Sequence, residues 1–210
     1  MSLIDKLFGS SRESPAPETR EPAERKAEVD GSLSAHAAAL LLRAPTALMQ
    51  LTEREALTVV GFMRPRLFKA GTTIIRQGEA ADTGFMVLVL NGEITVETLM
   101  ASRVNPATVT VLGPGSLIGE MALVDGGARS ASCTASSDVR CAVLTRSALE
   151  TLTTEQPVIA AKLMTAVAQR LAERLRESSH KLQVYSKLVQ TMQQEIDTLM
   201  PTPDRRLKDR

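Results

Sequence analysis

Between Arg66 and Arg146 the sequence breaks into short apolar runs that are separated by glycine. The runs are rich in β-branched residues, and Asn91-Gly92 between two of them is a strong hairpin signal. They are RLFKA, TTIIRQ, FMVLVL, EITVET, ATVTVL, SASCTA and VRCAVLT. Regular short strands with turn glycines are typical of an antiparallel sandwich or barrel. The segment therefore predicts an antiparallel β-roll of the jelly-roll kind, and the helical patterns on either side make the fold class α+β.

Two helices are expected before the roll, within residues 32–155 that we assign to this domain. From Ser32 onward, apolar residues recur on one side of a helix that Pro45 ends; they are Leu33, His36, Ala37, Leu40 and Leu41. Thr52 and Glu55 have the spacing of a capping box, which predicts the start of a second helix that stops before Pro65.

A long helix is expected over residues 156–200, because no helix breaker follows Pro157 until the chain reaches Pro201. One apolar stripe alternates spacings of four and three along it: Met164, Ala168, Leu171, Leu175, Ser178, Leu182, Tyr185, Val189, Met192, Ile196 and Leu199. A sustained heptad stripe favours a coiled coil over a helix packed on its own domain. We expect a homodimer through this helix; the pattern only mildly favours a parallel pair and leaves a trimer open.

The two ends of the chain have a different composition. Residues 2–8 place Leu3, Ile4, Leu7 and Phe8 on one helical face, and the stretch up to Gly31 is rich in Pro, Glu, Ser and Arg. Residues 1–31 are thus expected to be an amphipathic segment on a disordered tether, and residues 201–210 a disordered charged tail. The segment is expected to dock on a protein rather than a membrane, because Lys6 is its one basic side chain; folding back onto the roll or coiled coil is the alternative.

Charge and cysteine content restrict the possible partners. Lys and Arg number 25 against 24 Asp and Glu, so the net charge of +1 gives no basic field for DNA. Cys133 and Cys141 lack the spacing of a zinc site or a disulfide framework, and neither His36 nor His180 has partner ligands nearby in sequence. No metal site is expected. Without a spanning apolar run or a signal peptide, the protein is expected to be cytoplasmic.

The segment 118–131, IGEMALVDGGARSA, lies between two expected strands and combines a Gly-Glu pair, a short Ala- and Leu-containing stretch, a Gly-Gly turn and Arg-Ser-Ala. Here the chain resembles the cyclic-nucleotide-binding domain family, whose phosphate-binding cassette has these features in this order. FKAGTTIIRQGEAAD at 68–82 and FMVLVLNGEITV at 85–96 also look like strands of that family. The resemblance is to the sensor domain of catabolite-activator-like bacterial regulators, and it implies a ligand site at Gly119, Glu120, Met121, Ala122, Arg129, Ser130 and Ala131.

The chemistry of these residues fits that implication. A cyclic phosphodiester carries one negative charge beside a ribose 2′-hydroxyl, so its pocket needs a planar bidentate cation and a hydroxyl acceptor close together. Arg129 and Glu120 meet these needs, and Gly119 allows close approach of the backbone. The alternative is an Arg-Glu ion pair that merely closes a loop.

The base would be read elsewhere. In the dimeric bacterial activators of this family the long helix supplies small hydroxyl residues that contact the purine base. Counted from Gln156-Pro157, the corresponding positions here are Arg174 and Leu175. Arg174 is therefore a candidate for base contact, with a purely coiled-coil role as the alternative; Ser178 and Ser179 are weaker candidates. Cyclic AMP is the first expectation, and cyclic GMP and cyclic di-GMP stay open. No resident cofactor is expected.

After Leu199 the sequence has no room for the helix-turn-helix of the family's transcription factors. Output is therefore expected to pass to an unidentified protein partner, and DNA binding is not expected. No nucleophile-base pair is visible, so no catalytic residue is expected. The sequence predicts a non-enzymatic, homodimeric cyclic-nucleotide sensor; the alternative is a degenerate β-roll that serves as a nucleotide-independent scaffold.

Overall fold

The computed structural model describes residues 21–45, 47–48, 50–81, 83–98 and 107–199. The chain divides into two compact units, residues 1–168 and 169–210, and each is described by itself. The predicted amphipathic segment 2–8 and the predicted tail 201–210 lie outside the described residues. Within the described part, no helix combines the length and apolar character that crossing a membrane requires.

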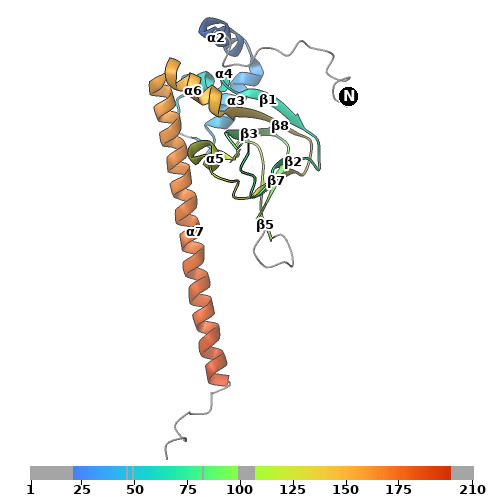
Figure 1. Cartoon of the computed structure of the whole chain (residues 1–210), viewed down its shortest axis with the longest axis vertical. Helices are drawn as coiled ribbons and strands as arrows, with labels where there is room; N and C mark the ends of the chain where they lie inside the picture. The colour runs from blue at the N-terminus through green and yellow to red at the C-terminus, as the bar shows by residue number, and fades with distance from the viewer. Residues whose placement is uncertain (1–20, 46, 49, 82, 99–106, 200–210) are drawn as a thin grey trace, which may run out of the picture. The chain divides into compact units, whose positions relative to one another are not determined.

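Two four-stranded antiparallel sheets form the body of the first unit (Figure 1). One sheet has the order β1 (Arg64–Phe68), β8 (Val139–Thr145), β3 (Phe85–Asn91) and β6 (Leu117–Ile118); the other has β2 (Thr73–Ile75), β7 (Ser132–Ala135), β4 (Ile94–Thr98) and β5 (Ala107–Leu112). The predicted β-roll and its seven strands are confirmed. The additional strand, β6, was not predicted because two paired residues are too few to show an alternating pattern.

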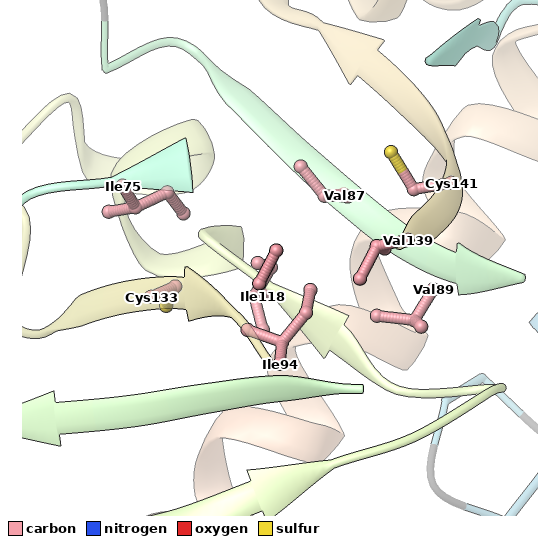
Figure 2. Close-up of a cluster of buried hydrophobic side chains, with 9 residues drawn as sticks. Ile75, Val87, Val89, Ile94, Ile118, Cys133, Val139 and Cys141 are labelled. Atoms are coloured by element: carbon pink, nitrogen blue, oxygen red, sulfur yellow. The ribbon is translucent and has the colours of Figure 1, made fainter. Parts of the chain in front are cut away.

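The core of the roll lies between the two sheets. Its side chains come from strands of both sheets and lie together in Figure 2; they are Ile75, Val87, Val89, Ile94, Ile118, Cys133, Ala135, Val139 and Cys141. Both cysteines are free thiols. Burial raises the pKa of the Cys141 thiol to about 11, so it behaves as a small apolar side chain at neutral pH.

Strand β3 is buried on both of its faces. Val87 and Val89 contribute to the core between the sheets, whereas Met86 and Leu88 alternate with them and are also fully buried. The second face is covered from the helical side, where α3 (Leu33–Leu42) contacts β3 and packs against α4 (Glu53–Gly61). This double coverage explains why FMVLVL reads as a continuous apolar run.

The two predicted N-terminal helices begin where the sequence indicated, after Ser32, where the helical pattern starts, and after Thr52, where the capping box lies. The Ser32 hydroxyl accepts from the N–H of Ala35 at 3.3 Å. Thr52 and Glu55 form the complete capping box, in which the Thr52 N–H donates to Glu55 Oε2 at 2.9 Å. Both signals are local in sequence, and therefore no tertiary information is needed to locate these starts.

The apolar side of α3 that the sequence pattern indicates is not the buried side. Leu33 and Leu40 are 90% and 69% exposed, whereas Ala38, Ala39 and Leu42 are buried. The helix is apolar nearly all round, so periodicity alone does not decide which side faces the core. Small alanines on the buried side permit close packing against α4 and β3.

The predicted disordered tether is wrong over α2 (Pro22–Asp30), which is helical. Although its sequence is highly charged, the helix makes a buried contact. The Arg25 guanidinium lies 4.0 Å from the centroid of the Phe62 ring and donates to Glu155 Oε2 at 2.5 Å. Arg25 is only 4% exposed. Contacts with α4 and α6 (Arg146–Glu155), both distant in sequence, therefore hold a helix that composition alone predicts to be unfolded.

The long helix α7 (Pro157–Leu199) agrees with the predicted helix to within one residue at either end. Its first turns belong to the first unit, where Ala160, Leu163, Ala166 and Val167 are buried. The compact unit consequently ends at residue 168 rather than at the predicted boundary of 155. In the second unit the helix exposes a large part of the heptad stripe: Leu175, Leu182, Tyr185, Val189, Met192, Ile196 and Leu199.

Candidate functional site

The segment between β6 and β7 forms a short helix, α5 (Glu120–Asp125), that lies against β3. Gly119 precedes it with φ of 78° and Gly126 ends it with φ of 69°, both in the left-handed region that favours glycine. At the C-terminal end, Arg146 Nη2 donates to the carbonyl of Ala122 at 3.0 Å. The two glycines and Arg146 thus fix the two ends of this short helix.

Arg129 reaches back from the turn after α5 to the start of that helix. Its Nη1 donates to the carbonyl oxygens of Gly119 at 2.9 Å and Phe85 at 3.1 Å, and its Nη2 donates to Phe85 O at 3.2 Å. The guanidinium also lies over the Phe85 ring, 4.2 Å from its centroid. The side chain is 5% exposed, so these contacts hold the cation in one position beneath the α5 start.

The Arg129 contacts account for three of the five N–H donors of a guanidinium. Both Nη1 donors and one Nη2 donor face carbonyl oxygens. Among the described residues, Nε and the second Nη2 donor have no protein acceptor at hydrogen-bond distance. That pair of donors is the edge that binds a phosphate or carboxylate in bidentate fashion.

Gly119 is required by space as well as by its backbone angle. A Cβ atom at this position would lie 2.6 Å from Arg129 Nη1, 3.0 Å from Phe85 O and 3.1 Å from Ile75 Cδ1. Any side chain would therefore displace the guanidinium. The residue that opens the short helix and the residue that supplies the positive charge are packed as one unit.

The site combines one buried cation with nearby carboxylates. Burial lowers the pKa of Arg129 from its ordinary value, while the nearby Cys133, Glu79 and Glu120 act in the opposite direction. Glu120 is 3% exposed. Arginine keeps its proton across the physiological range, so the site presents a desolvated positive charge beside a buried acidic side chain.

The other predicted residues of the segment surround this pair. Ser130 is exposed and its hydroxyl lies 3.7 Å from the sulfur of Met121, which is also exposed. Ala122 is buried and Ala131 half-buried. The structure therefore brings residues 119–122 together with residues 129–131, as the spacing of the motif requires.

Sequence reasoning missed the residues that hold Arg129 in place. Phe85 was assigned only to a strand, yet it supplies both a carbonyl acceptor and an aromatic ring to the guanidinium. The Gly78 N–H donates to the Arg129 carbonyl, and the Arg129 N–H donates to the Glu79 carbonyl, each at an N···O distance of 2.9 Å. Residues so distant in sequence carry no local signal of this role.

Arg174 lies on α7 in the second unit. Its contact with a nucleotide base stays a prediction. Within the described residues, no group of three or more His, Cys, Asp or Glu side chains is arranged to hold a metal ion.

The model of the cyclic nucleotide-binding domain family matches residues 65–156 of this chain. This range contains all eight strands except the first residue of β1, and it contains the entire segment that holds Arg129 and Glu120. The sequence motif and the family match therefore identify the same part of the first unit.

Two curated relatives show the range of proteins that contain such a sequence. The chain is 33% identical over 124 residues to the cyclic AMP receptor protein of Thermus thermophilus, covering 59% of this chain and 56% of the relative. It is 31% identical over 130 residues to a cyclic nucleotide-gated potassium channel of Rhizobium etli, covering 62% of this chain and 34% of the channel. The chain thus spans between a third and just over half of these relatives.

Solved structures agree with this result. A cyclic nucleotide-binding domain from Methylobacillus flagellatus has a TM-score of 0.62 and 26% identity, covering 72% of this chain and 84% of that one. The catabolite activator protein of Thermus thermophilus has a TM-score of 0.57 and 31% identity, covering 70% of this chain and 62% of that one. The likeness in both cases extends over most of the chain described here.

Proposed function

We propose that the chain, whose residues 65–156 match the model of the cyclic nucleotide-binding domain family, is a cyclic-nucleotide sensor. It would signal to a protein partner through a self-associating α7. The observation that carries the proposal is the fixed, buried Arg129 with a donor edge that no described protein acceptor occupies. A cyclic phosphodiester supplies one anionic group able to accept from that edge.

Glu120 gives the site its second contact in this proposal. Its buried carboxylate is an acceptor for the ribose 2′-hydroxyl, which lies beside the cyclic phosphate in the ligand. α5 adds main-chain N–H groups at its start, because Gly119 provides no side-chain cap for them. Ser130, which is exposed, would contribute a further hydroxyl.

Cyclic AMP is the ligand that we propose first. Two similar proteins carry it in their names, the cyclic AMP receptor protein of Thermus thermophilus and a cAMP-activated regulator of Mycobacterium tuberculosis. Cyclic GMP is the next choice, because a Drosophila cGMP-dependent protein kinase is 31% identical over 112 residues. Arg174 would set the preference between bases, since its donors suit guanine O6 and N7.

Homodimerisation through α7 is supported by the exposed heptad stripe of the second unit. A single helix has no means of covering that stripe, and a second copy of the same helix does so with the matching period. Ligand binding would act on the partner by favouring one arrangement of α7, which requires different nucleotide affinity in two states. We place this non-catalytic regulator in the cytoplasm, where buried free thiols such as Cys133 stay reduced.

Calorimetric titration with a panel of cyclic mono- and dinucleotides tests the proposal. We expect saturable binding of one cyclic nucleotide by the parent chain, and an affinity roughly ten- to hundredfold lower for Arg129→Ala, because a charge-assisted contact contributes about 1.5–3 kcal/mol. Arg129→Lys keeps the charge but loses the bidentate edge, so its affinity should be intermediate.

The matched control is Arg140→Ala, which removes an exposed arginine from β8 and should leave affinity unchanged. Arg129→Ala should also lower the free energy of unfolding, because Phe85 O and Gly119 O lose their donor. Titrations are therefore run well below the melting temperature of the variant. A parent chain that binds none of the nucleotides would contradict the sensor and favour a dimeric scaffold.

A further inference from the structure

Helix α3 presents an apolar face to solvent. Leu33, Ala37 and Leu40 are all exposed, and their spacing of four and three residues places them on one side of the helix. The opposite side is the one that packs against α4 and β3. A helix that is apolar on both sides normally has neighbours on both sides, so this face indicates an interaction surface.

The chain itself contains a second segment with an apolar face, which can cover the apolar face of α3. The spacing of Leu3, Ile4, Leu7 and Phe8 predicts that they share one side of a helix over residues 2–8, with Asp5 and Lys6 at its polar positions. Residues 9–21 join this segment to Pro22, the first residue of α2, and α2 contacts α3. A connection of that length spans roughly 40 Å when extended, so the segment can reach α3 of its own chain.

Covalent connection favours the internal occupant over an external one. A short tether holds a segment at an effective concentration on the order of millimolar, so even a weak intrinsic affinity keeps the surface occupied. We infer that residues 2–8 bind the outward face of α3 in the same chain, where they bury Leu33, Ala37 and Leu40. A protein partner that binds residues 2–8 must then displace them from α3, which makes this contact an internal competitor. This contact does not require nucleotide binding.

Trypsin cleavage after Lys6 tests the contact in the full chain. The synthetic peptide 1–21 gives the intrinsic rate of cleavage after Lys6, expressed relative to the rate of cleavage after Arg12 in the connection 9–21. In the parent chain we expect that relative rate to fall about fivefold or more, because a docked segment must dissociate before cleavage. Mass spectrometry of early time points measures both cleavages in one sample.

Leu33→Glu/Leu40→Glu should restore the relative rate of the free peptide. Val158→Glu changes an exposed apolar residue of similar size outside α3 and should leave the protection intact. If the α3 variant unfolds, Leu7→Glu in the segment tests the same contact from the other side, with hydrogen exchange of α3 as the readout. That substitution should increase α3 exchange.

Three results would overturn the inference. Cleavage after Lys6 at the peptide's relative rate would show that the segment is undocked. Protection that survives Leu33→Glu/Leu40→Glu would place the segment on another surface. Protection that disappears on dilution would assign the contact to a second copy of the chain.

Discussion

Gly119 illustrates at the scale of one residue how backbone angle and space combine. Gly119→Ala should weaken nucleotide binding, because it requires an alanine at φ of 78° and places Cβ 2.6 Å from Arg129 Nη1. Gly71→Ala is the matched control: its φ is 82°, but no atom lies within 4 Å of the added Cβ. Both variants should lose about 1 kcal/mol of folding stability from the backbone alone. Only Gly119→Ala should also lose nucleotide affinity. Equal affinities in the two variants, measured by calorimetry, would show that Arg129 is not displaced.

Arg174 is the residue proposed to read the base. Replacing it with alanine should change the ranking of adenine and guanine nucleotides more than their common affinity, because the phosphate contact lies at Arg129. Arg176→Ala is a suitable control, since it removes an exposed arginine from the same helix. Competition titrations with cyclic AMP and cyclic GMP measure the ranking. An equal loss for both nucleotides, or no loss, would return Arg174 to a role in the coiled coil alone.

At the scale of elements, two ion pairs connect the N-terminal helices with the junction of α6 and α7. Arg25 of α2 pairs with Glu155 of α6, and Glu55 of α4 pairs with Lys162 of α7. Glu55 also accepts from the Thr52 N–H, so one carboxylate caps α4 and holds α7. These contacts all lie inside the first unit, and they explain why its boundary includes the first turns of α7.

The Glu55 pair gives the first unit a specific acid response. The hydrogen bond from Lys162, together with the Thr52 N–H, lowers the pKa of Glu55 to about 2 from 4.5. A carboxyl group with a lowered pKa in the folded state stabilises the fold fully above its unfolded pKa, and the stabilisation disappears as pH falls towards 2. Lys162→Met should therefore lower the melting temperature at pH 7, and the difference from the parent should shrink between pH 4.5 and 2.

Lys26→Met is the control for that pH series, because it removes an exposed lysine from α2 of the same unit. Its melting temperature should follow that of the parent at every pH. A difference between Lys162→Met and the parent that stays constant down to pH 2 would assign the stabilisation to packing of the lysine stem rather than to the ion pair.

At the scale of the whole molecule, the second unit should determine the oligomeric state. Truncation after Glu177 removes the heptad stripe from Ser178 onward while the roll keeps all its strands, so the truncated chain should be monomeric. In the full-length chain, Leu182→Glu/Val189→Glu places charges on the stripe and should have the same effect, whereas Gln183→Glu, off the stripe, should not. Light scattering coupled to gel filtration measures the masses. A truncated chain that is still dimeric would move the interface to the first unit.

Much of the fold follows from the sequence because the relevant signals are local. Turn glycines separate the strands, Ser32 and Thr52 begin helices by capping, and the stretch from Pro157 onward contains no helix breaker. The predicted cassette from Gly119 to Ala131 is also one continuous segment, so its residues could be proposed from the sequence before the fold was known. Each of these features is decided by neighbours a few residues away.

The tertiary structure decided what depends on residues far apart in the chain. Only the packed roll places Phe85 under Arg129, because 44 residues separate them. Only contacts with Phe62 and Glu155 make a helix of the charged segment around Arg25. The side of α3 that faces the core was also fixed by its neighbours, since an all-apolar helix buries whichever side fits the adjacent surface. Sequence patterns report local backbone preference, whereas the burial of a side chain and the placement of a charge depend on which distant residues the completed fold brings into contact with it.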